Sequence, residues 1–186
     1  MNVSQKVTLR YNHAASVAVR RVLDDWPAKS RRIAKSLIEK YGTPHEATPS
    51  MLLWNYNGYW KRTVIHREGV RHNVPRPHLD ILEQTVDAKV RPNTFAEIMK
   101  FDGSISINRT RGEMTAYCES EHANIFLLNL AHDIAIGRQT ALQAQKVLYD
   151  ASDFFHAHLP NNYRDSLLFT ATIQTNDQDM VTAQPN

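Results

Sequence analysis

The stretch MLLWNYNGYWKRTVIHR, residues 51–67, decides the fold. Large apolar and aromatic side chains fill its first half, which is typical of a β-strand. Asn57 and Gly58 follow, and both residue types tolerate a positive φ, so this pair is the best hairpin signal in the chain. Residues 59–67 then alternate as a return strand, but both of its faces carry apolar and polar groups. The stretch predicts an antiparallel hairpin and leaves open which of its faces is buried.

A further strand and a second hairpin are expected downstream. Residues 82–90 alternate between apolar and polar side chains, as in a strand with one face in water. Residues 104–110 and 113–118 predict two strands joined at Arg111 and Gly112. Two hairpins without β-α-β alternation favour an antiparallel sheet of about five strands.

Helical patterns precede and follow these strands. Residues 29–41 place apolar side chains at helical spacing and end at Gly42, where a left-handed cap belongs. Residues 120–136 end at Gly137 and are apolar on most sides, which is typical of a central, buried helix. Two further helices are expected to begin at capping boxes, which pair Thr94 with Glu97 and Thr140 with Gln143.

These elements predict an α+β fold, in which helices cover one face of the antiparallel sheet. We expect an N-terminal helical arm over residues 1–27 and a single α+β domain over residues 28–160. Residues 161–186 end in a polar stretch, and we expect this C-terminal tail to be largely disordered.

One acidic residue on the 120–136 helix needs an explanation. A polar side chain on a mostly apolar helix must face solvent or find a partner. Asp133 therefore either lies on the solvated edge of the helix or pairs with Arg109 or Arg111 of the second hairpin.

Charge and cysteine usage limit the function classes. The chain carries 22 Lys and Arg against 19 Asp and Glu, and residues 1–50 hold nine of the former and four of the latter. This mild excess does not favour a dedicated nucleic-acid binder, although the basic helix at residues 29–41 leaves weak nucleic-acid binding as a hypothesis. Cys118 is the only cysteine, which fits a reducing compartment, and its alternation with apolar neighbours predicts a buried thiol. We expect a cytoplasmic protein without a membrane partner.

The stretch HNVPRPHLD, residues 72–80, holds the candidate catalytic residues. Neutral imidazole and carboxylate groups are good ligands for zinc and similar metals. His72, His78 and Asp80 are therefore candidate metal ligands, and with His66 they form the candidate catalytic cluster. Nothing in their spacing forces them together, because the tight zinc motifs are absent. The sequence names no cofactor.

A purely structural interpretation of the same stretch is also open. Alternating prolines stiffen a loop into an extended path. The histidines and Asp80 would then satisfy backbone groups, and Arg76 would pair with Asp80 or face solvent.

Aromatic and basic residues nearby suggest a recognition surface. Trp54, Tyr56 and Trp60 belong to the first hairpin, and Arg62 and Arg76 follow in or after it. Rings beside guanidinium groups can bind an anionic or aromatic ligand by stacking and charge. We expect these five residues to bind a ligand on a concave surface beside the 72–80 loop.

Two stretches carry a resemblance. W-N-x-N-G-x-W-K-R-T at 54–63 and H-N-x-P-x-P-H-x-D at 72–80, together with FDGS, RTRGEM and NLAHDI further along, resemble an uncharacterised family of bacterial proteins. The resemblance covers roughly residues 38–149. It implies a single bacterial domain and carries over no activity, ligand or catalytic residue.

Three functions remain as hypotheses. The first is a module that binds a small molecule or a protein through the aromatic and basic surface, with a homodimer left open. The second is a small hydrolase or lyase, with or without a metal, that uses the histidine and aspartate cluster. The third is weak nucleic-acid binding through the basic helix.

Overall fold

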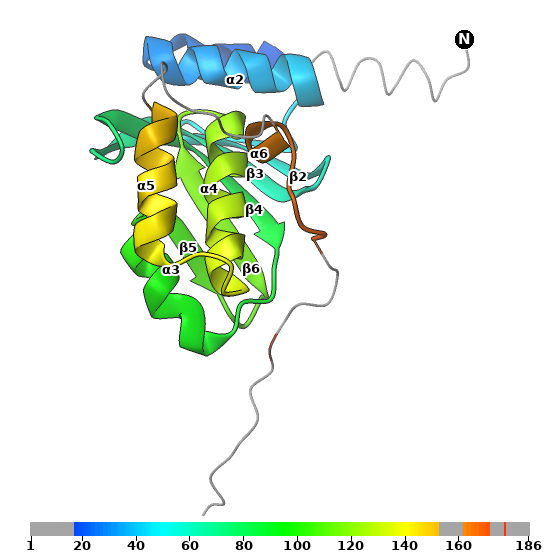
Figure 1. Ribbon diagram of the computed structural model, residues 1–186. Coiled ribbons are helices and arrows are strands. Elements are labelled where there is room, and N and C mark those ends of the chain that lie inside the picture. Colours follow the sequence, from blue (N-terminus) through cyan, green and yellow to red (C-terminus); the bar gives the residue numbers. More distant parts are fainter. Residues whose placement is uncertain (1–16, 153–161, 172–176, 178–186) are drawn as a thin grey trace, which may run out of the picture.

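The computed structural model describes residues 17–152, 162–171 and 177 of the chain. Figure 1 shows an antiparallel sheet with helices packed against it, so the α+β prediction is confirmed. The sheet has six strands in the order β1-β2-β3-β4-β6-β5, whereas the sequence predicts about five. The elements are β1 (Glu46–Ala47), β2 (Met51–Asn57), β3 (Trp60–His72), β4 (His78–Asp87), β5 (Ile105–Asn108), β6 (Glu113–Cys118), α2 (Ala28–Tyr41), α3 (Phe95–Phe101), α4 (Glu121–Ala135), α5 (Ala141–Ser152) and α6 (Asn162–Asp165).

The first hairpin forms where the sequence predicts it. Asn57 pairs with Trp60 across a two-residue turn, and Gly58 adopts a φ of 71°. The strands beyond it differ from the prediction, because β3 continues to His72 and β4 already begins at His78. The two prolines lie between these ends, outside the hydrogen-bonded ladder, so they do not interrupt either strand.

The pairing of β3 with β4 is irregular around Gly69. The register shifts between Ile65 and Val70, and this glycine lies against the neighbouring strand. A Cβ atom built at Gly69 would lie 2.6 Å from Cγ1 of Ile81 and 2.9 Å from Cβ of Leu79. No side chain fits there unless β4 moves.

Replacing Gly69 by alanine is therefore expected to lower the free energy of unfolding by about 1–3 kcal/mol, as overpacking does in a close-packed interior. Gly103→Ala is the matched control, because nothing lies within 4 Å of a Cβ atom at that position. Urea denaturation of both variants measures the difference. Equal stability of the two variants would contradict the close approach of the strands.

One face of the sheet carries the core. Leu52 pairs with Ile65, which pairs with Leu82, and all three are buried in one cluster with Ala34 and Leu37 of α2. In Figure 1, α4 and α5 lie over this face, and α2 crosses it at one end. The opposite face carries charged side chains, among them Arg62 and Glu83. The sequence of β3 has apolar and polar residues on both faces, and the structure shows which of these faces is directed toward the core.

The helix boundaries follow the capping signals with one exception. The side chain of Ser120 accepts a hydrogen bond from the backbone N–H of Ala123, and Gly137 has a φ of 76° beyond the end of α4. Thr140 and Gln143 form the reciprocal hydrogen bonds of a capping box. The box predicted at Thr94 and Glu97 is wrong, although α3 does begin at Phe95: the Thr94 hydroxyl donates to the Arg91 carbonyl, and Glu97 pairs with Lys100.

Described parts of both terminal segments contact the core. Residues 17–24 are helical, and the buried Val19, Leu23 and Trp26 share a cluster with Trp54. Residues 162–171 pack on α4, where Asn129 donates to the carbonyls of Tyr163 and Ser166. The side-chain amide of Asn129 therefore connects α4 to this part of the predicted tail. The rest of it lies outside the described residues, apart from residue 177.

The partners of Asp133 come from the segments that follow α4 in the sequence. Its carboxylate accepts from Arg138 at 2.7 Å and from the Tyr163 hydroxyl at 2.7 Å. Both expectations for this residue are wrong: it is buried, and its arginine follows α4 directly in sequence. None of the helices within the described ranges is long and apolar enough to cross a bilayer.

Candidate functional site

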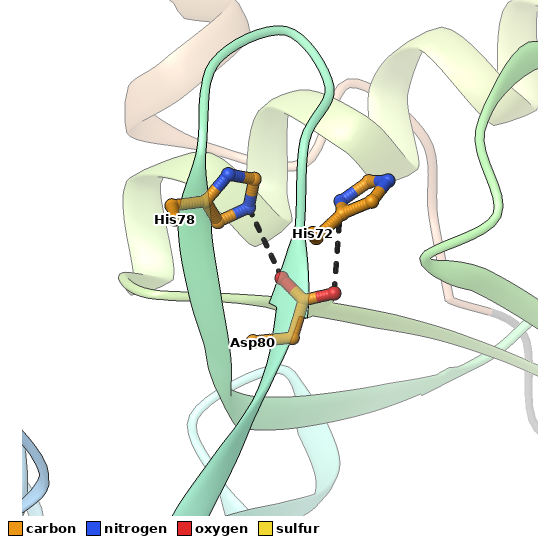
Figure 2. A group of neighbouring side chains, drawn as sticks. All are labelled: His72, His78 and Asp80. Atoms are coloured by element: carbon orange, nitrogen blue, oxygen red, sulfur yellow. Dashed lines mark ion pairs between the residues drawn. The ribbon is translucent and has the colours of Figure 1, made fainter.

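The ends of β3 and β4 bring three predicted residues together. His72 and His78 are paired across the two strands, and Asp80 follows on the same side of β4 because side chains alternate along a strand. The Asp80 carboxylate lies between the two imidazoles (Figure 2): Oδ1 is 3.1 Å from His78 Nε2, and Oδ2 is 3.6 Å from His72 Nδ1. One ligand atom from each residue lies within 4.8 Å of the others. The spacing of these three residues in the sequence does not require them to meet, but in the structure they do.

The proton on His78 is fixed by its surroundings. Its Nδ1 lies 2.7 Å from the backbone carbonyl of Arg76, which can only accept a hydrogen bond, so Nδ1 carries the proton. The other ring nitrogen, Nε2, lies 3.1 Å from Asp80 Oδ1 and 3.4 Å from Sγ of Cys118. Oδ1 of Asp80 accepts no hydrogen bond from the described residues.

His72 and Asp80 share a hydroxyl group. Ser104 Oγ donates to Asp80 Oδ2 at 2.7 Å and lies 2.8 Å from His72 Nδ1. The other ring nitrogen of His72 lies 3.8 Å from Oδ1 of Asp102. Each of the three residues thus has a further polar group beside it: the Arg76 carbonyl, Ser104 or Asp102.

Burial shifts the pKa values of two groups beside the histidines, Asp102 and Cys118. It raises the pKa of the Asp102 carboxyl, against hydrogen bonding from Ser104 and the nearby charge of His72. Burial also raises the pKa of the Cys118 thiol to about 12. The thiol therefore stays protonated at neutral pH and can donate to Nε2 of His78. The expectation of a buried thiol is confirmed.

A cavity of about 430 Å³ adjoins the cluster. His72, His78 and Asp102 line its polar end, and the 73–77 loop forms one side. The opposite wall comes from α4, α5 and α6, which contribute Phe126, Leu127, Leu148 and Arg164. A cavity of this volume suits a small molecule.

His66 does not belong to this cluster. It faces the opposite side of the sheet from Ile65, and its Nε2 lies 3.1 Å from Oε2 of Glu83. The predicted group of four is therefore wrong for His66. The reason is strand parity together with the irregular register, which sends His66 and His72 to different environments on the same strand.

The expected aromatic recognition surface does not form. Trp54 and Trp60 are 1% exposed, and Trp54 Nε1 donates to the Gly42 carbonyl, so both indoles belong to the core. Tyr56 is 79% exposed, and Arg62 pairs with Glu113 on the outer face of the sheet. The expectation that these residues line one concave surface with the 72–80 loop is wrong.

Arg76 is the member of that set that does line the cavity. It follows the cis peptide bond between Val74 and Pro75 in the loop. Its backbone carbonyl accepts a hydrogen bond from Nδ1 of His78 and orients that ring. Arg76 therefore contributes to the site through its main chain and also lines the cavity. Pairing of Arg76 with Asp80 is one of the two alternatives for this loop, and the contacts of Asp80 within the described residues are with His72, His78 and Ser104 instead.

Two residues of the site were not expected from the sequence. Asp102 and Ser104 come from the turn before β5, which the sheet order separates from β3 by two strands. Their short motif, in which the Ser104 N–H donates to Asp102 Oδ1 at 2.7 Å, is a common turn arrangement with no functional meaning of its own. Only the pairing of β4 with β6 brings it beside the histidines.

The donor set has the chemistry of a divalent metal site. Metal-bound histidines carry a hydrogen bond from the other ring nitrogen to a carbonyl or a carboxylate. His78 has the Arg76 carbonyl in that position. Nε2 of His72 lies 3.8 Å from Oδ1 of Asp102, which is beyond hydrogen-bonding distance, so His72 has a carboxylate nearby and not a bonded partner. Nε2 of His78 and a carboxylate oxygen of Asp80 could supply donors beside it.

No family model matches the chain, and neither the curated proteins nor the solved structures include a significant match to it. The resemblance to an uncharacterised bacterial family stays a prediction. The geometry of the site is therefore the basis for any functional statement.

Proposed function

We propose that the protein is a metal-assisted hydrolase of small molecules, with His72, His78 and Asp80 as the metal ligands. The observation that supports this most directly is the meeting of two imidazoles and a carboxylate at the polar end of a cavity. Two histidines and one carboxylate are a recurrent ligand set of catalytic metal centres, which keep at least one position open for water or substrate.

The chemistry follows from that open position. A divalent metal polarises a substrate carbonyl and lowers the pKa of bound water toward neutrality. The cavity would hold the substrate on the same side as His72 and His78, which line it. Ser104 would keep the carboxylate of Asp80 in place by its hydrogen bond to Oδ2.

Metal addition to chelator-treated, untagged protein tests the proposal. At a free Zn²⁺ or Mn²⁺ concentration 100 times the dissociation constant, binding is expected to stabilise the fold by about 2.7 kcal/mol. We expect this to appear as a rise in melting temperature and as metal-dependent hydrolysis of p-nitrophenyl butyrate. His66→Gln is the control, because its histidine lies outside the site and should leave both results unchanged. The absence of metal binding by calorimetry would overturn the proposal.

A second candidate is a small-molecule-binding protein without chemistry. The apolar wall of the cavity favours it, since Phe126, Leu127 and Leu148 can hold a ligand whether or not a metal is present. Metal-independent ligand binding without turnover of any ester or amide would support this candidate over the hydrolase. Protein ligands, a homodimer and a cytoplasmic location remain proposals.

Nucleic-acid binding through α2 also stays a prediction. The exposed face of this helix carries Arg31, Arg32 and Lys35 beside a shallow groove. Phosphate contacts make affinity fall steeply with salt. Binding of an RNA or DNA oligonucleotide at 50 mM salt that disappears at 200 mM would support it.

A further inference from the structure

The cavity beside the metal ligands combines two kinds of wall. Its polar end carries His72, His78 and Asp102, as described above. Its other wall carries the buried hydrocarbon side chains of Phe126, Leu127 and Leu148. Ligand cavities gain affinity mainly from apolar contact and gain orientation from a few polar groups. A fully polar small molecule would leave this second wall without a partner.

A cation is held at the apolar wall. Arg164 of α6 donates from Nη2 to the Ala151 carbonyl at 2.7 Å, and its guanidinium carbon lies 5.4 Å from the centre of the Phe126 ring. These two contacts fix the guanidinium beside the cavity that it lines. A guanidinium has five N–H donors in a planar fork that suits a carboxylate, and the bond to Ala151 takes one of them.

Charges along the cavity favour an anion. Arg164 is the cation of the apolar wall. The acidic lining residue Glu119 forms an ion pair with Lys29 of α2, which offsets its charge. Asp102 lies at the metal end, beside His72. The apolar part of the cavity is therefore next to positive charge.

We infer that the substrate is an amphipathic anion: a small ester or amide that carries an apolar acyl or aryl group and one carboxylate. The apolar group packs against Phe126 and Leu148, and the carboxylate meets Arg164. This inference rests on the proposed function for the position of the hydrolysed bond at the metal end. The binding of the apolar group and the charge does not need the metal.

Calorimetry with three probes tests the inference on chelator-treated and on Zn²⁺-loaded protein. Octanoate supplies a chain and a charge, octan-1-ol supplies the chain alone, and acetate supplies the charge alone. We expect octanoate to bind both forms of the protein, octan-1-ol to bind at least about tenfold more weakly, and acetate not to bind measurably.

Two variants locate the probe. Arg164→Gln is expected to weaken octanoate about tenfold or more, the loss expected for a hydrogen bond to a charged group, and to leave octan-1-ol unchanged. Ala123→Leu narrows the cavity from the first turn of α4 and is expected to weaken both probes. The matched controls lie on α5 with exposed side chains: Lys146→Gln for the charge and Leu142→Ala for the apolar contact. Unchanged octan-1-ol affinity in Arg164→Gln shows that the cavity remains formed.

The possible failures are separable. Octanoate that binds neither form overturns the substrate class, while metal binding still supports the hydrolase. Octanoate that binds only the Zn²⁺-loaded form and ignores Arg164→Gln is a metal ligand, which also overturns the inference. Equal affinities for octanoate and octan-1-ol overturn the anionic part of it. If the protein binds octanoate but no metal, the proposed hydrolase function is refuted. The inferred preference of the cavity for an amphipathic anion is then still supported.

Discussion

Asp80→Asn is expected to lower the affinity for Zn²⁺ by at least about 100-fold, since even the loss of an outer hydrogen-bonding partner of a metal ligand costs about 10–100-fold. The substitution keeps the shape of the side chain and removes the negative charge that faces both imidazoles. An amide in that place can also turn its NH₂ group toward Nε2 of His78 and occupy the lone pair. Competition with a chelating dye measures the change in affinity.

Glu83→Gln is the matched control for this variant. Glu83 and Asp80 both lie on β4, and each has a histidine of β3 beside it: His66 lies 3.1 Å from Glu83, and His72 lies 3.6 Å from Asp80. Glu83 faces the outer side of the sheet with His66, away from the cavity. We expect Glu83→Gln to bind Zn²⁺ as the unmodified protein does. Equal affinities in the two variants would show that Zn²⁺ binds elsewhere on the protein.

Trp54→Ala is expected to cost about 3–5 kcal/mol of unfolding free energy, the usual range for deleting a large buried aromatic side chain. The indole is 1% exposed, packs with Leu52 and Ile65, and donates to the Gly42 carbonyl at the end of α2. Its loss leaves a void and an unpaired carbonyl between α2 and the sheet. For a chain of this length, the melting temperature is expected to fall by about 6–20 °C.

Tyr56→Ala tests the same hairpin from outside. Tyr56 lies two residues further along β2 and is 79% exposed, so its replacement is expected to change stability by less than about 0.5 kcal/mol. Thermal unfolding followed by circular dichroism compares the two variants directly. A Trp54→Ala protein as stable as Tyr56→Ala would mean that the indole does not belong to the core.

Local signals in the sequence predict most of the sheet and helix boundaries. Asn57 and Gly58, the Ser120 cap and the Thr140–Gln143 box act within a few residues, and the structure has each of them. β1 could not be predicted, because it has two residues and forms only by pairing with β2. The burial of Trp54 could not be predicted either, since apolar side chains occur on both faces of its hairpin and packing by α2 decides between them.

Three residues of the site lie close together in the sequence, and two more are brought to them by the pairing of the strands. His72, His78 and Asp80 lie within nine residues, so a turn between two strands is enough to bring them together. Asp102 and Ser104 reach them only through β6, which pairs with β4 on one side and β5 on the other. His66 shows the limit of proximity in sequence: six residues before His72, it lies on the other side of the sheet.

The three candidate ligand side chains lie on paired strands, whereas one side of the neighbouring cavity comes from the five-residue connection at 73–77. Under the proposed function, the metal ligands and this part of the substrate-contacting surface belong to different parts of the backbone. Exchanging the sequence or the length of that connection, while retaining a carbonyl beside His78, would alter which compounds are admitted without displacing the three donors. The protein therefore offers a starting point for loop grafting, in which new selectivity is introduced around an unchanged reactive centre.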